Sequence, residues 1–300
     1  MTAPGRERRE QRVPTAHAGR RLDSFLAEIF ALGRKAARRA ILEGQVQVAG
    51  RAIRRPSAPL REGQLVELWA EPEHLAPDPG PLDVVTETDE LVVVLKPAGQ
   101  PTAPLRTLER GSLCGRLVAR YPEMRGVGFS PREPGVLHRL DTGTSGLVLA
   151  ARTERAFEAV RALSARGRFR KRYLALVWGT PDPPSGVIDA PLEPDPSRAG
   201  SVHLGGSYPA RSSYRVIERG HGKSLVELSI ERAYRHQIRV HLASIGHPLL
   251  GDPRYDPERR PAPRLALHAS TLELQGEPPY QLVAESKLPA ELAELLVEGA

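Results

Sequence analysis

Apolar residues near the start of the chain recur with helical spacing. Four of them follow the i, i+3, i+4, i+7 pattern of one helix face: Leu22, Phe25, Leu26 and Ile29. A second helix is expected over 34–42, because Gly44 follows where a glycine commonly ends a helix. Short apolar stretches at 46–48 and 65–68 then predict strands.

Beyond residue 80 the pattern predicts strands interspersed with a few helices, and not the regular alternation of a parallel α/β fold. Alternating or short apolar runs predict these strands: 83–86, 91–95, 147–151, 172–178, 212–218, 224–230 and 265–274. Helices are expected from Thr153 to about Gly167, over 235–245 and over 288–296. The expected fold class is therefore α+β.

Basic residues are concentrated in the first quarter of the chain. The whole sequence has 43 Lys+Arg and 36 Asp+Glu, a net charge of +7. Residues 1–70 hold 14 basic and 7 acidic residues, and the rest holds 29 of each. A compact basic unit joined to a neutral body indicates a module that binds a polyanion.

An acidic, proline-rich stretch separates the two parts. Residues 71–90 contain seven acidic residues, no Lys or Arg, and four of the prolines, a composition typical of a semi-rigid linker. The predicted organisation is a disordered basic arm (1–12), a small polyanion-binding domain (13–70), a linker (71–81) and a large domain (82–300). An apolar fraction of 40% suits one large and one small core.

Several classes of protein do not fit this sequence. No apolar run approaches the roughly 18–20 residues of a membrane span, and residues 1–13 lack the apolar core of a signal peptide. The single cysteine, Cys114, excludes an internal disulfide framework. We therefore expect a cytoplasmic protein with no membrane partner, and nothing indicates an obligate oligomer, so a monomer is expected.

Some familiar motifs fail when their spacing is checked. Gly143–Gly146 (GTSG) lacks the second glycine of a serine nucleophile turn, because Leu147 stands there. Neither a phosphate-binding loop nor a dinucleotide-binding glycine motif is present. His138, His236 and His241 could together hold a metal, but the spacing and companion carboxylates of a metal site are missing. No metal is expected.

A charged quartet, His138-Arg139-Leu140-Asp141, precedes an apolar strand. Polar side chains on a loop that buried structure supports are a common place for chemistry. Taken alone, however, Asp141 could simply cap the turn or pair with Arg139.

Residues 20–70 (RRLDSFLAEIFALGRKAARRAILEGQVQVAG and onward) resemble the alpha-L RNA-binding motif first known from a small-subunit ribosomal protein. In that module basic helix residues face RNA phosphates. The resemblance assigns this role to Arg34, Lys35, Arg38 and Arg39. Gly33 and Ala49 replace residues common in the motif, but neither change removes a cation.

The second part of the chain resembles the RluA-type family of RNA pseudouridine synthases over about residues 82–280. The motifs that carry the likeness occur in family order: LVVVLKPAGQP (91–101), HRLD with TSGL (138–147), RKRYLALVWG (170–179), RHQIRVHLASIGHPLLGDPRY (235–255) and ALHASTLEL (266–274). The resemblance implies a mixed, mainly antiparallel sheet. It also implies an isomerase that detaches uracil from its ribose and rejoins it through carbon 5, with no ATP, metal or redox cofactor.

The resemblance also implies roles for site residues. Asp141 matches the catalytic aspartate, which could attack the sugar or the base or remove the ribose 2′ proton. Arg239 matches the arginine that pairs with it, and an adjacent cation favours an ionised carboxylate. Tyr173 matches a tyrosine whose ring stacks on uracil and whose hydroxyl could move the carbon 5 proton. Arg139, with His138 beside it, matches the residues implied in base flipping.

Two segments depart from the family pattern. A His-Pro pair is common where this chain has Gln100–Pro104, and Tyr234 stands where Arg is frequent in a Thr-Gly-Arg start at 232–234. Both departures affect expected RNA contacts more than chemistry. Cations nevertheless gather on the two segments expected to meet RNA, with 9 basic and 3 acidic residues in 138–172 and 7 and 3 in 211–239.

The sequence therefore predicts an RNA pseudouridine synthase that acts on structured RNA, ribosomal RNA in preference to transfer RNA. The alternative is an RNA-binding protein whose synthase domain no longer catalyses, which an intact Asp141, Tyr173 and Arg239 argue against. A glycosidase or nuclease would need a second acid or metal ligands beside Asp141.

Overall fold

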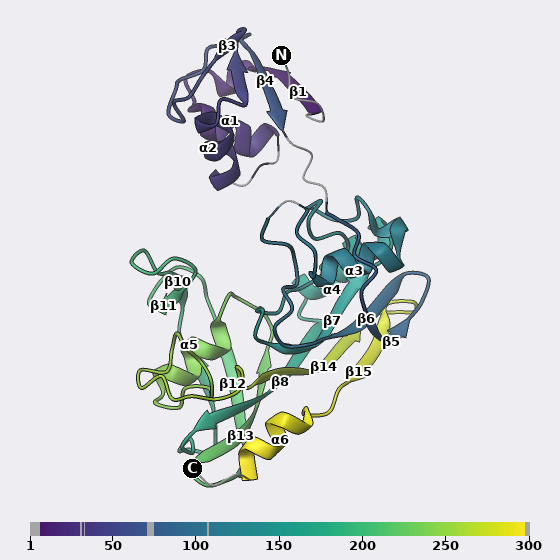
Figure 1. The fold of residues 1–300 in the computed structure, drawn as a ribbon, viewed down its shortest axis with the longest axis vertical. Helices are drawn as coiled ribbons and strands as arrows, with labels where there is room; N and C mark the ends of the chain where they lie inside the picture. The colour runs from purple at the N-terminus through teal and green to yellow at the C-terminus, as the bar shows by residue number, and fades with distance from the viewer. Residues whose placement is uncertain (1–6, 31, 33, 71–74, 107, 298–300) are drawn as a thin grey trace. The chain divides into compact units, whose positions relative to one another are not determined.

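The computed structural model describes residues 7–30, 32, 34–70, 75–106 and 108–297, and it leaves out the side chains of 7, 34–36 and 70. The chain divides into two compact units, Met1–His74 and Leu75–Ala300, which are described one at a time (Figure 1). None of the helices in the described ranges is long and apolar enough to cross a membrane.

The first unit packs two helices on a four-stranded antiparallel sheet of order β1-β4-β2-β3. Its elements are β1 (Glu7–Arg12), the 3-10 turn η1 (Thr15–His17), α1 (Leu22–Ile29), α2 (Arg34–Leu42), β2 (Val46–Val48), β3 (Arg51–Ala52) and β4 (Leu65–Ala70). Phe25 and Leu26 of α1 are fully buried against Ile41 of α2, as the helical spacing predicts. Both predicted helices and the strands at 46–48 and 65–68 are confirmed.

Residues 7–12 correct the prediction of a disordered arm, because they form β1. Every residue of β1 pairs with β4. The side chains add support: Arg8 Nη2 donates to Glu67 Oε1 at 2.6 Å, and Arg9 Nη2 donates to the carbonyl of Phe30 at 2.8 Å. The stretch ERREQR has no apolar alternation, so pairing with β4 determines this strand. Residues 1–6 of the expected arm lie outside the described residues.

The expected linker also needs correction. Its residues 71–74 lie outside the described ranges, whereas 75–81 belong to the second unit. Leu75 is buried in that unit's core. The Asp78 carboxylate accepts from the amide of Gly111 at 2.7 Å, and the Asp78 amide donates to the carbonyl of Gly115 at 2.9 Å. The large unit therefore starts before the predicted residue 82.

The second unit is built on a nine-stranded mixed sheet of order β5-β6-β7-β14-β8-β13-β12-β9, with β15 also pairing with β14. Its elements are β5 (Asp83–Glu87), β6 (Leu91–Lys96), α3 (Leu113–Arg120), η2 (Pro122–Met124), β7 (Ser145–Ala151), α4 (Glu154–Ala165), β8 (Phe169–Trp178), β9 (Ser185–Asp189), β10 (Leu192–Pro194), β11 (Val202–Leu204), β12 (Arg211–Arg219), β13 (Lys223–Ile230), α5 (Gln237–Ser244), β14 (Leu267–Gln275), β15 (Gln281–Glu285) and α6 (Ala290–Val297). β14 runs parallel to β7, and the other described pairs in this sheet are antiparallel. The α+β fold with a mixed, mainly antiparallel sheet is thereby confirmed.

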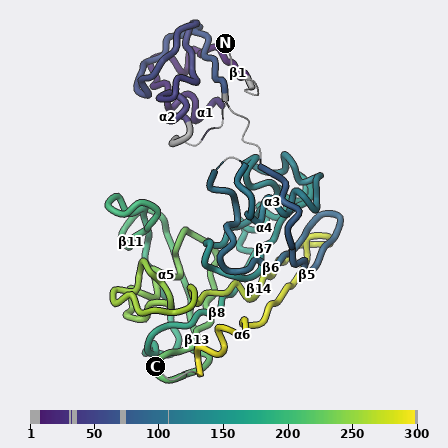
Figure 2. The backbone as a smooth tube through the Cα atoms, viewed as in Figure 1, coloured from purple at the N-terminus to yellow at the C-terminus, as the bar shows by residue number. Residues whose placement is uncertain are grey.

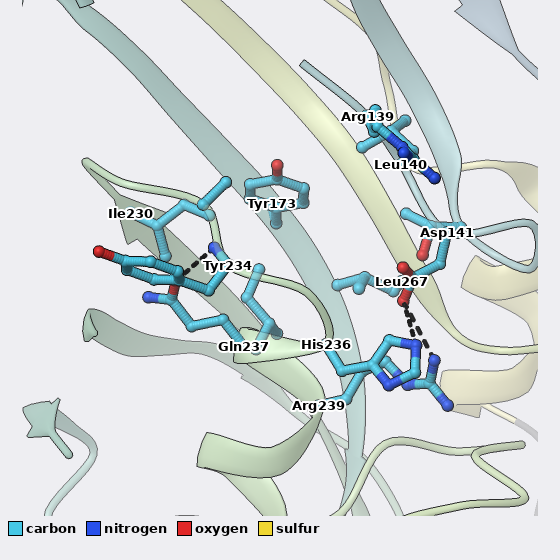
Figure 3. Close-up of a pocket in the computed structure, with 13 residues that line it drawn as sticks. Arg139, Leu140, Asp141, Tyr173, Ile230, Tyr234, His236, Gln237, Arg239 and Leu267 are labelled. Carbon is cyan, nitrogen blue, oxygen red and sulfur yellow. Dashed lines mark hydrogen bonds and ion pairs between the residues drawn. The ribbon is translucent and has the colours of Figure 1, made fainter. Parts of the chain in front are cut away.

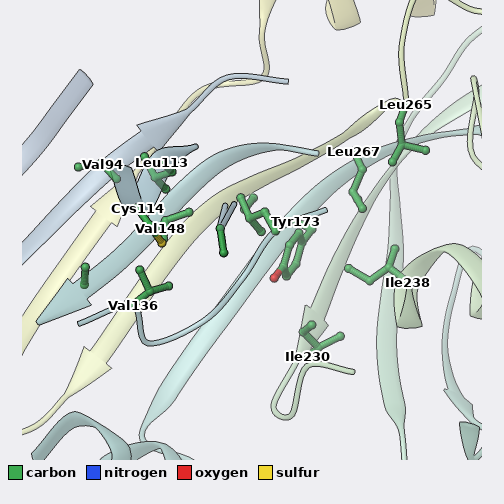
Figure 4. Packing of buried hydrophobic residues seen from close by; sticks show 14 of the residues in the cluster. Val94, Leu113, Cys114, Val136, Val148, Tyr173, Ile230, Ile238, Leu265 and Leu267 are labelled. Atoms are coloured by element: carbon green, nitrogen blue, oxygen red, sulfur yellow. The ribbon is translucent and has the colours of Figure 1, made fainter. Parts of the chain in front are cut away.

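Both faces of this sheet are covered. Alternate residues of β6 point to opposite sides, with Val94 packing against α3 on one face (Figure 4) and Val93 packing with Phe157 of α4 on the other. The C-terminal helix α6 returns to β13 (Figure 2), and its buried Leu292 and Leu296 share a core cluster with Leu176 of β8 and Leu225 of β13.

The strand order determines where the site forms. Only β14 separates β7 from β8, and Ala269 of β14 pairs with both Gly146 and Tyr173. The loop that ends at the start of β7 therefore lies near the middle of β8. There Tyr173 is paired with Leu228 of β13 and Ala269 of β14. The turn after β13 leads into α5, and both supply residues to the pocket that Tyr173 lines (Figure 3).

Candidate active site

A pocket that is partly open to solvent collects side chains from the loop before β7, from β8 and from the turn that enters α5 (Figure 3). Its polar lining includes Arg139, Asp141, Thr144, Tyr173, Tyr234, His236, Gln237 and Arg239, and its apolar lining includes Leu140, Ile230, Ile238 and Leu267. The structure thus brings together four residues that the sequence singled out: Arg139, Asp141, Tyr173 and Arg239.

Asp141 and Arg239 form an ion pair although 98 positions separate them. Arg239 Nη1 donates to Asp141 Oδ2 at 3.1 Å. The Asp141 side chain is 27% exposed, whereas that of Arg239 is only 7% exposed. The carboxylate therefore faces the pocket with one oxygen held by a buried cation.

Arg239 is itself held by Asp252, a residue that the sequence reasoning did not assign. Arg239 Nε donates to Asp252 Oδ2 and Nη2 donates to Asp252 Oδ1, both at 2.8 Å. Burial would raise the pKa of Asp252, but the hydrogen bonds and charge of Arg239 outweigh it and lower that pKa. The signal in the sequence was that Asp252, directly after Gly251, is the only acidic residue of the 235–255 motif.

Thr102 fixes the loop that carries Asp141. Its Oγ1 donates to the carbonyl of Leu140 at 2.8 Å and accepts from the Leu140 amide at 3.2 Å. Thr102 is 3% exposed and lies in the Gln100–Pro104 segment that departs from the family pattern. Thr102 therefore supports the loop that carries Asp141 from inside the protein, in a segment where the sequence predicted altered RNA contacts.

Lys96 supports the same loop and was also missed. Its fully buried ammonium donates to the carbonyls of Gln100 at 2.7 Å, Pro97 at 3.0 Å and Thr142 at 3.4 Å. Burial lowers the pKa of Lys96 to about 8; the charge of Asp141 opposes this shift and Arg264 adds to it. Lys96 thereby joins the turn after β6 to the residue that follows Asp141.

His236 also lies next to Asp141, although the sequence analysis named it only as a candidate metal ligand. Its backbone is left-handed (φ 55°) at the start of α5, its Nε2 lies 3.7 Å from Asp141 Oδ2, and its Nδ1 lies 3.0 Å from the Tyr255 hydroxyl. Burial lowers the pKa of His236 to about 4, despite the opposing charge of Asp141. The imidazole is therefore neutral at pH 7 and Arg239 supplies the positive charge at the carboxylate.

Tyr173 lies between Asp141 and Ile230 in the close-up of the pocket (Figure 3). It is 4% exposed. Burial, and then the negative charge of Asp141, raise the pKa of the Tyr173 hydroxyl. The side chain therefore remains a protonated phenol at neutral pH, with its ring at the pocket.

The two remaining residues of the quartet differ in exposure. The Arg139 side chain is 61% exposed at the pocket, where Nη1 donates to Glu133 Oε1 at 2.7 Å. His138 does not line the pocket: its ring packs edge-on against Phe169, and Nε2 accepts from the amide of Leu149 at 3.1 Å. His138 is therefore held by a backbone amide and a buried ring inside the protein, and its contact with RNA stays a prediction.

The three candidate metal histidines do not meet. His241 lies on α5 with Nδ1 2.9 Å from Ser212 Oγ and Nε2 3.0 Å from the carbonyl of Ala190. Across the described ranges, no group of three or more His, Cys, Asp or Glu side chains is placed to hold a metal ion.

The basic residues of α2 are described in part. Arg38 and Arg39 are exposed, while Ala37, Ala40 and Ile41 are buried in the core of the first unit. The side chains of Arg34 and Lys35 lie outside the described residues.

Comparison with known proteins gives a consistent result. Residues 90–244 match the profile described as RNA pseudouridylate synthase, and residues 20–66 match the S4 domain. An uncharacterized RNA pseudouridine synthase from Chloroflexus aurantiacus is 40% identical over 275 residues, which are 87% of this chain and 84% of the relative. Ribosomal large subunit pseudouridine synthase D of Nitrosomonas europaea is 36% identical over 308 residues, 96% of this chain and 86% of the relative. Human RNA pseudouridylate synthase domain containing 1 matches with a TM-score of 0.57 and 25% identity, covering 69% of this chain and 83% of that structure.

Proposed function

Since the chain belongs to the RNA pseudouridylate synthase family, and is thus an isomerase that converts uridine in RNA to pseudouridine, we propose that Asp141, Tyr173 and Arg239 perform this conversion. The observation that supports these roles most directly is the contact between partly exposed Asp141 and buried Arg239 in the pocket that Tyr173 lines.

The reaction conserves every atom of the nucleotide. The bond from uracil nitrogen 1 to ribose carbon 1′ breaks, and a bond from uracil carbon 5 to carbon 1′ forms. Carbon 5 gives up its proton and nitrogen 1 acquires one. Because nothing is added, the site needs an oriented carboxylate, a route for a proton and protection from water.

Asp141 supplies the carboxylate in this proposal. Arg239 holds Oδ2, and within the described residues no hydrogen bond engages Oδ1, which is therefore available to the nucleotide. The ionised group acts either as a nucleophile or as the base that removes the ribose 2′ proton. Asp252 positions Arg239 and so fixes the aim of Asp141 indirectly.

Tyr173 supplies the ring and the proton route. Its ring faces the pocket, where it can stack on the uracil. As a phenol with a raised pKa, it can pass a proton only by giving up its own as it accepts another. Leu140, Ile230, Ile238 and Leu267 line the remaining wall and exclude water that would otherwise hydrolyse an opened glycosidic bond.

The proposed substrate is ribosomal RNA of the large subunit, which would place the enzyme in the cytoplasm. Support comes from relatives named ribosomal large subunit pseudouridine synthase D, which are 36% identical to this chain. The first unit matches the S4 domain, and we assign RNA phosphate contacts to its exposed Arg38 and Arg39, and to Arg34 and Lys35 on the same helix. Arg139 at the exposed rim would fill the space that the flipped uridine leaves.

Mapping pseudouridines in vivo tests this proposal. Carbodiimide treatment followed by primer extension is applied to large-subunit ribosomal RNA and transfer RNA from cells lacking the gene. The same cells expressing the wild type or Asp141→Asn are the controls. We expect at least one ribosomal stop to vanish and to return with the wild type alone. If every stop persists, and purified protein modifies no transcript, the chain is the non-catalytic RNA-binding protein.

A further inference from the structure

Two tyrosines form a surface beside the pocket that the reaction does not use. Tyr234 lines the pocket on the side away from Asp141 (Figure 3), and Tyr208 is 47% exposed next to it. Their ring centroids are 5.8 Å apart, with 40° between the ring planes. We call this pair the aromatic ledge.

The aromatic ledge is held in place by the surrounding backbone. The amide of Tyr208 donates to the carbonyl of Leu192 at 3.1 Å, and the carbonyl of Tyr208 accepts from the Leu192 amide at 2.9 Å. The amide of Tyr234 donates to Gln237 Oε1 at 3.0 Å, and its ring packs against the small core that includes Val240. A ring surface that is already ordered loses little entropy when it binds a flat ligand.

Three arginines without acidic partners in the described part of the chain gather near the turn that joins Tyr234 to His236. Arg235 follows Tyr234 directly, and its guanidinium and that of Arg254 both reach within 4 Å of the point where a side chain on Gly200 would begin. Arg198 Nη1 donates to the carbonyl of Arg254 at 2.8 Å, and Arg254 Nη1 donates to Ser201 Oγ at 2.9 Å. In the described part of the chain none of these three forms an ion pair with a carboxylate. We call them the arginine cluster.

In the described part of the chain, the two nearby acids, Asp195 and Asp252, form no ion pair with the arginine cluster, and Asp252 is paired with Arg239. Asp195 Oδ1 accepts from the amides of Ser197 and Arg198 and from the Ser197 hydroxyl, so it is engaged by its own turn. By contrast, another exposed aromatic residue, Phe129, already stacks with Arg161 at 4.1 Å and with Phe157. Accessible aromatic rings and guanidinium groups without acidic partners are the combination that binds single-stranded nucleic acid.

We propose that the aromatic ledge and the arginine cluster form a second nucleotide subsite, which stacks the base and binds the phosphate of a nucleotide adjacent to the target uridine. The inference rests on the proposed function, because it places the target uridine over Tyr173 and Asp141. Flipping a uridine out of RNA leaves a neighbouring base without a stacking partner, and the aromatic ledge replaces that partner. Every base has a flat face, so stacking here is tolerant of base identity.

The stacking half is tested with the transcript that carries the uridine mapped above. Tyr208→Ala and Tyr234→Ala are each expected to raise the Kd by roughly 5- to 150-fold, the range of one base stacked on an aromatic ring. The loss falls on KM more than on kcat, because Asp141 and Arg239 stay in place. Tyr234→Phe keeps the ring and is expected to retain most of the wild-type affinity. This variant separates the loss of stacking from misfolding. Phe129→Ala is the control for an exposed aromatic residue outside the pocket.

An abasic nucleotide on either side of the target uridine completes the test. For the wild type, the abasic change at one of the two sides costs about the same factor as Tyr234→Ala. In the double variant Tyr208→Ala, Tyr234→Ala, the same abasic change should lower the RNA affinity little further, because the rings that stack on the base are already gone. The stacking site would be overturned if the abasic change weakened binding by the same factor in the wild type and in the double variant, at both sides of the uridine. That result would favour a protein ligand for the aromatic ledge.

The phosphate half is read from salt dependence. Changing Arg198, Arg235 and Arg254 together to Gln is expected to lower the log–log slope of affinity against salt by about 0.7 for each phosphate that the variant no longer binds. Arg219→Gln is the matched control. Arg219 is also an exposed arginine, but it lies at the far end of β12 from Ser212, which pairs with Ile230 of the pocket. A triple variant with the wild-type slope would overturn the arginine cluster. If the wild type modifies the transcript but these variants keep its affinity and salt slope, the subsite fails and the proposed function stands. If the wild type forms no pseudouridine on any transcript, the proposed function itself fails.

Discussion

Replacing Asp252 by Asn removes the carboxylate that orients Arg239 without touching the pocket lining. Arg239 donates hydrogen bonds from Nε and Nη2 to Asp252 and from Nη1 to Asp141. An Asn side chain has one acceptor oxygen, so at least one of the two buried N–H groups of Arg239 would face an amide N–H group. The buried cation would also lose its closest counter-charge.

The magnitude follows from the burial of the pair. Breaking a buried ion pair by removing one partner costs about 3–5 kcal/mol. For a unit of this size one kcal/mol changes the melting temperature by about 2–4 °C, so Asp252→Asn is expected to melt roughly 6–20 °C lower. The single-turnover rate should fall by more than about tenfold because Arg239 no longer fixes Asp141, while RNA affinity stays within about threefold.

A matched control separates catalysis from stability. Asp256 is also buried, at 3% exposure, and Arg260 Nη2 and Nε donate to its two oxygens at 3.1 and 3.2 Å. Asp256 does not line the pocket, so Asp256→Asn should lower the melting temperature but leave the rate of the folded protein close to wild type. Calorimetry and rapid-quench assays well below both transitions measure the two effects. Equal rates for Asp252→Asn and Asp256→Asn would refute the positioning role.

The stability difference should also depend on pH in a known direction. The pKa of Asp252 is lowered in the folded protein, so the unfolded state binds a proton first as the solution becomes acidic. The stabilisation is complete above the ordinary aspartate pKa of about 4 and is lost as the pH falls through the lower folded value. Wild type and Asp252→Asn should therefore converge in free energy of unfolding below about pH 4.

Three other changes give separate tests. Tyr173→Phe keeps the ring and should slow single turnover by about 10²–10⁴-fold with RNA affinity within severalfold, whereas an unchanged rate would remove the hydroxyl from the proton route. The folded pKa of Lys96 is about 8, below its ordinary value of about 10.4. The free energy of unfolding of the wild type should therefore rise from about pH 8 to 10 relative to that of Lys96→Met, and an unchanged difference over this range would contradict the burial of its charge. Changing Arg38 and Arg39 to Gln should lower the salt slope of RNA affinity by about 0.7–0.9 for each phosphate contact, and an unaltered slope would place RNA elsewhere.

Periodicity predicted the elements that bury a regular apolar face. Leu22, Phe25 and Leu26 mark α1 because all three point into one core. The strand β1 was missed because its residues ERREQR carry no such face and are ordered by pairing with β4. Helix α3 was also missed, since its apolar positions in LCGRLVAR are broken by Gly115, whose close approach to the carbonyl of Ala76 leaves no room for a side chain.

The site shows a similar division. Motif likeness selected Asp141, Tyr173 and Arg239, and the structure brings them to one pocket. It did not assign Asp252 or Lys96, because their roles depend on which backbone and side-chain atoms meet across the fold. Likewise His138 lies in the right motif, but its ring direction is decided by Phe169, which the local sequence does not reveal.

Release of tritium from RNA that carries 5-tritiated uridine tests the central assignment, because carbon 5 must lose its hydrogen when it bonds to the ribose. Wild type and Asp141→Asn are compared in single turnover at saturating RNA. Asn has nearly the shape of Asp and can still accept a hydrogen bond from Arg239, so the fold and RNA affinity should persist. We predict release by the wild type and a rate at least about 10³-fold lower for Asp141→Asn. Release by Asp141→Asn within about tenfold of wild type would contradict the role of Asp141.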